Sequence, residues 1–200
     1  MTDFEFVAGL DEAGRGPLAG PVTAACVILP LGFPVEMLDD SKKLSEKKRM
    51  KIEPLIKDSC CWGLAIVDHK EIDRINILQA SMKAMKIAFE NMLENLPSWC
   101  GKNNLPVPDP KMISAVADGN KCPDISCNVR AEVKADAKFP CVMAASIIAK
   151  VERDKIMTEY DKLYPQYGYA KHKGYPTAAH RKICLEIGPS PIQRLTFDVK

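Results

Sequence analysis

The sequence predicts an α/β domain followed by a helical extension at the C-terminus, and two features of the chain lead to this prediction. Apolar segments of strand length occur in the first third, and a long segment with helical spacing of apolar residues follows them. The last forty residues differ, because tyrosines alternate there with proline, glycine and basic residues. We therefore expect a main domain over residues 1–160 and a helical extension over residues 161–200 that packs on it.

Three early segments have the composition of β-strands. Residues 4–10 alternate loosely and end at Asp11, residues 22–29 are apolar and partly β-branched, and residues 62–67 form a third segment of this kind. A tight, glycine-rich turn joins the first two segments. We therefore expect the sheet to begin with antiparallel strands.

Helices are predicted from the spacing of apolar residues and from capping residues. Ser45 is expected to cap a basic helix that runs toward Lys57 and is kinked or interrupted at Pro54. Apolar residues three and four positions apart predict a helix over residues 70–95. The prolines of residues 97–110 predict a long surface loop after it.

The second half of the chain alternates strands with helices. Residues 112–117 and 129–134 are predicted strands, and residues 141–160 are a predicted helix with small side chains on its early turns. Thr177 is expected to open a short helix that Gly188 closes. The order of these elements favours a single sheet with helices packed on it.

Composition excludes some classes of protein. Hydrophobic residues make up 46% of the chain and charged residues 27%, which argues against both a disordered chain and a membrane protein. No apolar run approaches the roughly 20 residues that a membrane-spanning helix needs. Residues 1–6 lack the basic start and apolar stretch of a signal peptide. We therefore expect a cytoplasmic protein that does not associate with membranes.

The cysteines and basic residues give weaker indications of disulfides, metal sites and binding partners. The eight cysteines are irregularly spaced, which indicates buried, reduced thiols rather than a disulfide framework or a zinc site. The net charge of +2 says little about partners, but basic residues gather in residues 42–51 and 171–182. Such clusters suit a polyanion, although a solvated helix face is the commoner explanation for either one alone.

Acidic side chains stand at the ends of separate predicted strands. Asp11, Asp118 and Asp136 come from three segments, and Glu12 is beside the first. Functional groups gather at the C-terminal ends of strands in an open α/β sheet, so we expect these side chains to converge. Their oxygens suit Mg²⁺ or Mn²⁺, and two such ions about 3.5–4 Å apart promote phosphodiester cleavage. Taken singly, Asp11 and Asp118 also suit turns, and Asp136 suits a helix N-cap.

The most specific string in the chain is DEAGRGPLAGPV, residues 11–22. Its glycines leave backbone amides unshielded, so a nucleic-acid strand can approach closely. The string resembles the opening motif of the ribonuclease HII family, and further matches follow in the family's order over most of the chain. They are DDSKKLS (residues 39–45), ADGN (117–120), KADAK (134–138), AASIIAKVERD (144–154) and HKGYPT (172–177).

The resemblance implies a fold and a catalytic centre. The implied fold is ribonuclease H-like, a mixed five-stranded α/β sheet flanked by helices, with a C-terminal helical extension. Asp11, Glu12, Asp118 and Asp136 are implied as the catalytic residues, and together they would hold two Mg²⁺ or Mn²⁺ ions during catalysis.

The resemblance also implies three kinds of substrate contact. A backbone turn would sense the 2′-hydroxyl, which is the feature that separates RNA from DNA at one nucleotide. Lysines would contact phosphates without reading base sequence, and an aromatic ring would stack on the sugar at the RNA–DNA junction. Gly14, Arg15 and Gly16 are implied for the backbone turn, Lys42 and Lys43 for the phosphate contacts, and Tyr175 for the stacking ring. Without the motifs, Arg15 would be interpreted as an ordinary surface charge and Tyr175 as a ring that packs under the C-terminal helix.

Some residues depart from the family or are set aside. The string QRLTF, residues 193–197, stands where the family usually has His-Arg-x-Ser-Phe. Glu152 and Asp154 are expected to form ion pairs on a helix surface, because basic residues lie within one turn of them. His172 and His180 are expected outside the catalytic set, since a metal-bound water can supply the nucleophile.

The predicted function is an endonuclease that hydrolyses the RNA strand of RNA–DNA hybrids and incises 5′ of single ribonucleotides in duplex DNA, leaving 5′-phosphate and 3′-hydroxyl ends. Its expected roles are ribonucleotide excision repair and primer removal in DNA replication, and we expect a monomer. A ribonuclease HIII-like enzyme is the first alternative, against which the Gly-Arg-Gly turn and the lack of a domain before residue 4 argue. The others are a non-catalytic hybrid-binding module and a structural α/β protein, which would leave the ordered motifs unexplained.

Overall fold

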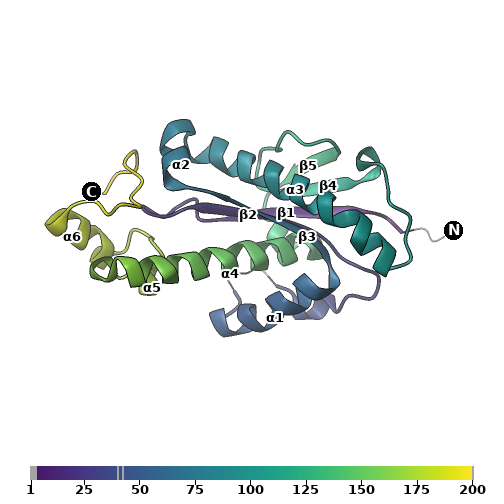
Figure 1. The fold of residues 1–200 in the computed structure, drawn as a ribbon, viewed down its shortest axis with the longest axis horizontal. Helices are drawn as coiled ribbons and strands as arrows, with labels where there is room; N and C mark the ends of the chain where they lie inside the picture. The colour runs from purple at the N-terminus through teal and green to yellow at the C-terminus, as the bar shows by residue number, and fades with distance from the viewer. Residues whose placement is uncertain (1–3, 40, 42, 200) are drawn as a thin grey trace.

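A mixed five-stranded sheet lies at the centre of the computed structural model, which describes residues 4–39, 41 and 43–199 (Figure 1). The strand order is β3–β2–β1–β4–β5. The strands are β1 (Val7–Ala13), β2 (Val22–Ile28), β3 (Cys61–Val67), β4 (Ser114–Asp118) and β5 (Asn128–Glu132). β1, β2 and β3 pair antiparallel as predicted, whereas β4 and β5 run parallel to β1.

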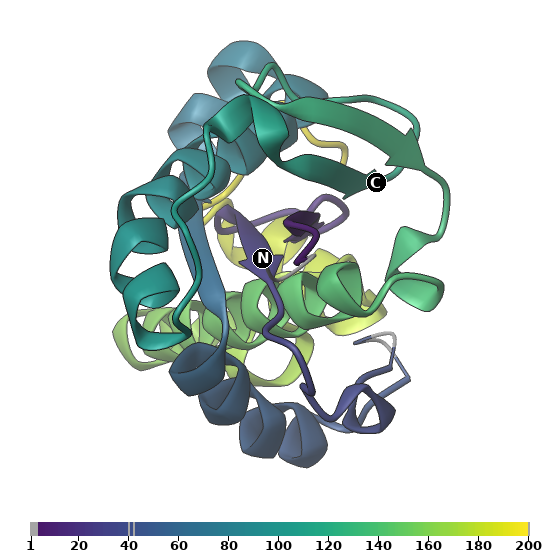
Figure 2. The same cartoon turned by 90° about the vertical axis from the view of Figure 1, so that its right-hand side faces the viewer.

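Helices cover both faces of this sheet, as Figures 1 and 2 show. The longer helices are α1 (Glu46–Ser59), α2 (His69–Ile75), α3 (Ile77–Lys102), α4 (Pro140–Leu163) and α6 (Ala178–Ile187). All of β2 is buried, and its side chains alternate between two cores. Cys26 and Ile28 pack in the core that includes α3, whereas Ala25 and Val27 pack in the core that includes α1 and α4.

The region from α2 to α3 differs from the prediction. The predicted single helix over residues 70–95 is two helices, because Asn76 has φ 66° and starts α3 by accepting a hydrogen bond from the amide of Gln79. The loop predicted from residue 97 is wrong at its start, since α3 continues through Pro97. A proline inside a helix costs about 3 kcal/mol. Burial of Trp99, whose Nε1 donates to the Ser59 carbonyl at 2.8 Å, offsets part of this cost.

The start of α1 is as predicted, but its interior is not. The Ser45 hydroxyl caps the helix by accepting a hydrogen bond from the amide of Lys48. The helix runs through Pro54 without interruption, with Ile52 and Ile56 buried against the core shared with α4. As at Pro97, tertiary burial outweighs the local preference of proline.

The C-terminal part consists of short helices packed against the end of α4. They include η4 (Pro165–Tyr167), α5 (Tyr169–His172) and α6, which Thr177 caps as predicted. Tyr167 and Tyr169 are buried in a cluster with Met157 of α4 and Ile192. The helix α4 itself runs through residue 160, and the division of the chain at that residue stays a prediction.

Two predictions from composition concern membrane-spanning helices and the state of the cysteines. Across the part of the chain that the structure describes, no helix combines the length and apolar character needed to cross a bilayer. All eight cysteines are free, and most are buried, which confirms their predicted character as thiols that pack as small hydrophobes.

Candidate active site

The register of two parallel strands brings Asp11 and Asp118 together. The pairing of β1 with β4 ends with Leu10 opposite Ala117, so the two aspartates that follow are neighbours across a strand spacing of about 4.8 Å. The prediction placed Asp11 after its strand, which is wrong. β1 continues to Ala13 because its antiparallel pairing with β2 extends beyond the end of β4.

A short 3-10 helix, η3 (Ala135–Ala137), supplies Asp136. The chain leaves β5 at Glu132 and turns through Lys134, which has φ 59°. Asp118 Oδ1 accepts a hydrogen bond of 2.7 Å from the amide of Ala135, which ties η3 to the end of β4. Asp136 therefore lies beside the strand ends, and it is the N-cap of neither η3 nor α4.

These three aspartates form one group, which we call the carboxylate floor (Asp11, Asp118 and Asp136). Carboxylate oxygens from all three lie within 4.8 Å of one another, with Asp11 and Asp136 buried. Burial, together with the charges of Glu12 and Asp118, raises the pKa of Asp11 well above its usual range, while hydrogen bonds from Ser146 and the Glu12 amide act in the opposite direction. Gathered, partly buried oxygens of like charge fit a divalent cation.

Glu12 lies next to the carboxylate floor without being part of it. Among the described residues, the group within 4.8 Å does not include it, because successive residues of a strand point to opposite sides. Its Oε1 lies 3.3 Å from Nη1 of Arg15, and its side chain is mostly buried. Glu12 and Asp11 nevertheless line one cavity of about 330 Å³, together with Asp118.

Three further polar residues line this cavity that the sequence did not single out. They are Ser41, Ser146 and Lys150. The hydroxyls of Ser41 and Ser146 lie 2.6 Å apart, and Ser146 also hydrogen-bonds Asp11. The sequence offered no signal for them beyond the motifs that contain them, and Ser146, among alanines on a helix, has the character of a small packing residue.

The same cavity is also lined by Gly14, Arg15, Gly16 and Tyr175, which we call the rim. A Cβ on Gly16 would lie 3.8 Å from the Tyr175 ring, so the two segments are adjacent. The ring is 39% exposed, and Nζ of Lys150 lies 5.7 Å from its centre. The fold thus places three of the predicted carboxylates and four of the predicted substrate contacts around one cavity, with Asp136 beside Asp11 and Asp118.

The two predicted phosphate-contacting lysines are not part of this group. Lys43 is not among the described residues that line the cavity, and its exposed side chain lies 3.4 Å from a carboxylate oxygen of Asp39. Lys42 lies outside the described residues. The contact assigned to either lysine therefore stays a prediction.

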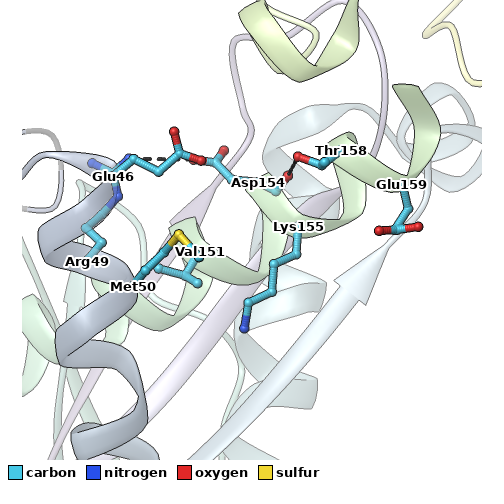
Figure 3. Close-up of a pocket in the computed structure, with 8 residues that line it drawn as sticks. All are labelled: Glu46, Arg49, Met50, Val151, Asp154, Lys155, Thr158 and Glu159. Carbon is cyan, nitrogen blue, oxygen red and sulfur yellow. Dashed lines mark hydrogen bonds and ion pairs between the residues drawn. The ribbon is translucent and has the colours of Figure 1, made fainter. Parts of the chain in front are cut away.

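Glu152 and Asp154 form ion pairs, as predicted, although Asp154 is buried rather than on a surface. Asp154 accepts from Lys150 at 2.7 Å and lies 3.6 Å from Arg49 of α1. It lines a groove of about 250 Å³ between α1 and α4, where Figure 3 shows it between Arg49 and Thr158. Glu152 pairs with Lys57 and Lys155. These carboxylates join helices and are separate from the carboxylate floor.

His172 and His180 support the backbone beside the rim. Their rings stack with centres 4.3 Å apart. His172 Nδ1 accepts from the amide of Gly174 at 3.2 Å, and His180 Nδ1 lies 3.0 Å from the carbonyl of Tyr175. Burial lowers the pKa of both rings, which favours the neutral form. Both histidines were expected outside the catalytic set, and neither lines the cavity among the described residues.

A mixed five-stranded sheet with helices on both faces, and with carboxylates gathered beside its central strand, defines a nuclease of the ribonuclease H-like class. Solved structures agree with this class. The ribonuclease H2 from Pyrococcus horikoshii OT3 matches with a TM-score of 0.70 and 28% identity, covering 96% of this chain and 94% of that one. Bst-RNase HIII in complex with Mn²⁺ matches with a TM-score of 0.69 and 17% identity, covering 98% and 68%. At that identity the second match speaks for the fold alone.

The sequence comparisons define the family more narrowly. The family model described as Ribonuclease HII matches residues 8–200. A protein named Ribonuclease HII from Treponema denticola is 48% identical over 198 residues, covering 97% of this chain and 98% of the relative. The chain belongs to the ribonuclease HII family. It is accordingly a nuclease and a hydrolase, as the sequence predicted.

Proposed function

We propose that the chain hydrolyses the RNA strand of RNA–DNA hybrids and also incises on the 5′ side of single ribonucleotides embedded in duplex DNA, leaving 5′-phosphate and 3′-hydroxyl ends. One observation carries the proposal: Asp11 and Asp118 of the carboxylate floor line the same cavity as the rim. A scissile phosphate held over the floor would have its neighbouring sugar at the rim. This juxtaposition links cleavage to recognition of the nucleotide being cut.

The carboxylate floor, with Glu12 beside it, is proposed to hold Mg²⁺ or Mn²⁺, with two ions during catalysis. The donor set supports this, because carboxylate oxygens are the ligands that hard divalent cations prefer. Bound ions would activate a water and neutralise the leaving oxygen. Neighbouring groups would orient the carboxylates by hydrogen bonds: Ser146 orients Asp11, and the amide of Ala135 orients Asp118.

The rim is proposed to recognise the ribonucleotide. Backbone amides at Gly14, Arg15 and Gly16 offer donors to the sugar-phosphate backbone and to a 2′-hydroxyl. The half-exposed Tyr175 ring suits stacking on the sugar at a junction. Lys43 is proposed to contact phosphates farther along the strand, and the same role is proposed for Lys42.

The setting of this activity is part of the proposal. We place residues 161–200 as a substrate-binding extension on the catalytic domain, because Tyr175 reaches the cavity from this part of the chain. The protein would act as a monomer in the cytoplasm, where eight reduced thiols persist. There it would remove misincorporated ribonucleotides and RNA primers.

The test is cleavage of labelled duplexes by the purified protein. One duplex carries a single ribonucleotide in DNA and the other is an RNA–DNA hybrid, each incubated with Mg²⁺, Mn²⁺ or chelator. We expect metal-dependent incision 5′ of the single ribonucleotide and cleavage of the hybrid. Cutting of the hybrid alone would favour a ribonuclease HIII-like specificity, and binding without any cutting would favour a non-catalytic module.

A pair of variants assigns the activity to the carboxylate floor. Asp118→Asn keeps the shape and the acceptor oxygen but removes the charge, so we expect cleavage to be nearly abolished while duplex binding remains. Asp124→Asn removes a charge from an exposed aspartate that pairs with Lys86 and should leave cleavage unchanged. Full activity in Asp118→Asn would refute the assignment.

A further inference from the structure

The segment of the chain near its C-terminus lies along the glycine-rich turn (residues 14–21), beside the end of the sheet where Figure 1 shows the yellow coil meeting the purple turn. The amide of Gly20 donates to the Ile192 carbonyl at 2.9 Å, and the amide of Arg194 donates to the Leu18 carbonyl at 2.8 Å. A bridge between Ala19 and Gln193 lies between these hydrogen bonds. We call residues 192–196 the C-terminal strap.

Arg194 of the C-terminal strap uses its whole guanidinium group on the glycine-rich turn. The side chain is fully buried, and its donors reach five backbone carbonyls at 2.6–3.1 Å. These belong to Gly14, Arg15, Pro17, Gly20 and Pro21. An arginine side chain has five N–H donors in a fixed planar arrangement, so this one residue can donate a hydrogen bond to each of the five carbonyls.

These hydrogen bonds determine which way the peptide groups of the rim face. In a trans peptide, the carbonyl of one residue and the amide of the next point in opposite directions. Because the carbonyls of Gly14 and Arg15 face Arg194, the amides of Arg15 and Gly16 are directed away from it, at residues that line the cavity. The buried guanidinium thus presents amide donors on the substrate side of the turn.

A second buried arginine joins the turn to the segment that carries Tyr175. Arg153 of α4 donates to the carbonyls of Ala19 and Pro21 on one side and of Lys173 on the other, at 2.9–3.2 Å. The amide of Leu18 also donates to the Gly174 carbonyl at 2.8 Å. These contacts fix the spacing between the two halves of the rim.

We propose that Arg194 is a positioning residue for selectivity: it holds the amides of the rim in place for a single ribonucleotide, while the carboxylate floor is built independently of it. This inference rests on the proposed function and deepens it. The floor stands on β1, β4 and η3, whereas all five hydrogen bonds of Arg194 go to the turn. A long hybrid has many ribonucleotides that can contact the protein, so its cleavage depends less on one exact register of the rim.

The anchor of the C-terminal strap provides a second way to disturb the rim. Asp73 of α2 accepts hydrogen bonds from the amides of Leu195 and Thr196 at 2.8 and 3.1 Å, and from the Thr196 hydroxyl at 2.6 Å. Removing this partly exposed carboxylate loosens the strap from outside and leaves the buried turn intact. Where the family usually has serine, Thr196 keeps a hydroxyl group, and in this chain that hydroxyl donates to Asp73.

The experiment compares Arg194→Lys, Asp73→Ala and the neighbouring surface control Arg74→Lys, which changes an exposed arginine paired with Glu71. Lysine keeps the charge but offers three donors in place of five. We expect Arg194→Lys to lower kcat/KM on the single-ribonucleotide duplex about 30-fold, as loss of two hydrogen bonds of about 1 kcal/mol each implies. In this variant kcat/KM on the long hybrid should fall less than about threefold, so the ratio of kcat/KM on the single-ribonucleotide duplex to that on the hybrid should fall. Asp73→Ala should lower the same ratio by a smaller factor.

A binding measurement in chelator separates recognition from cleavage. The preference of the folded protein for a single-ribonucleotide duplex over an all-DNA duplex should shrink in Arg194→Lys and stay unchanged in Arg74→Lys. Equal losses on both cleavage substrates, or an unchanged ratio, would overturn the inference. If Arg194→Lys does not fold, an unchanged ratio in folded Asp73→Ala overturns it instead. Failure of the unmodified protein to cut at a single ribonucleotide would refute the proposed function, whatever the variants do.

Discussion

Asp11 and Asp118 of the carboxylate floor line the same cavity as the rim, but the floor and the rim are held by different parts of the chain. The floor follows from the register of β1 and β4 and from one hydrogen bond between Asp118 and η3. The rim depends on buried arginines, one of which reaches Gly14 across 180 positions of sequence. The proposed chemistry and the proposed selectivity would therefore have separate supports, so substitutions should be able to change one without the other.

The two regions also differ in their internal energetics. Burial and the neighbouring acidic groups raise the pKa of Asp11, so without a cation the floor destabilises the fold locally. In the rim, the carbonyls of Gly14 and Arg15 accept hydrogen bonds from Arg194, which contribute to stability. The floor should therefore gain stability when charge is removed, and the rim should lose stability when its packing is disturbed.

The largest expected effect comes from Asp11→Asn. Loss of this carboxylate should lower cleavage by at least about 1,000-fold, or roughly 4 kcal/mol of barrier. In chelator the same variant should melt about 2–4 °C higher than the unmodified protein, because it removes a carboxylate whose charge is disfavoured by burial and by its acidic neighbours, a gain of about 1 kcal/mol. Cleavage assays and thermal melts check both parts, with Asp124→Asn as the control. A lower melting temperature in chelator would contradict this account of the floor.

Gly14→Ala should give the next largest effect, on stability. Gly14 has φ +105°, and a Cβ there would lie 2.2 Å from Arg153 Nε. Strain and overlap together should cost about 3 kcal/mol and lower the melting temperature by about 6–12 °C.

Gly32→Ala is the matched control for Gly14→Ala. Gly32 also has a positive φ, of +73°, but nothing lies within 4 Å of an added Cβ. It should therefore cost only the backbone strain, about 1 kcal/mol. Equal melting temperatures for the two variants would show that the contact with Arg153 is unimportant.

Ser146→Ala tests the link between the floor and the loop that carries Ser41. Removing the hydroxyl should lower kcat/KM about tenfold, because Asp11 and Ser41 each lose a hydrogen bond. Ser81→Ala is the control, since that hydroxyl is buried and has no hydrogen-bond partner among the described residues. The control should change kcat/KM less than about twofold. If the two variants behave alike, Ser146 does not orient Asp11.

The smallest effect is the pH dependence of stability at the rim. Burial lowers the pKa of His172 and His180 below the unfolded value of 6.5, so the unfolded chain binds more protons once the pH falls below that value. Their contribution is fully present above about pH 6.5 and is lost as the pH falls through the folded pKa values. Thermal melts at pH 7.5 and 5.5 should differ by about 2 °C from this source. The difference should shrink in a His172→Asn/His180→Asn double variant, and an equal slope in both proteins would contradict the explanation.

Local sequence patterns determined much of this protein. The family motifs identified Asp11, Asp118 and Asp136, and the structure groups them as expected. Strand-forming segments, the caps at Ser45 and Thr177 and the free thiols also follow from residue type and spacing. These features depend on short-range hydrogen bonding and on burial of apolar side chains, which a sequence displays directly.

The tertiary structure decided what depends on contacts between distant segments. Burial of Trp99 carries α3 past Pro97, against the local preference of proline. The roles of Ser41 and Ser146 depend on the packing of a loop against α4. The role of Arg194 depends on hydrogen bonds from its guanidinium group to carbonyls near the other end of the chain, such as that of Gly14. Local spacing and residue type do not show such contacts, because they depend on which distant segments the packing of the whole core brings together.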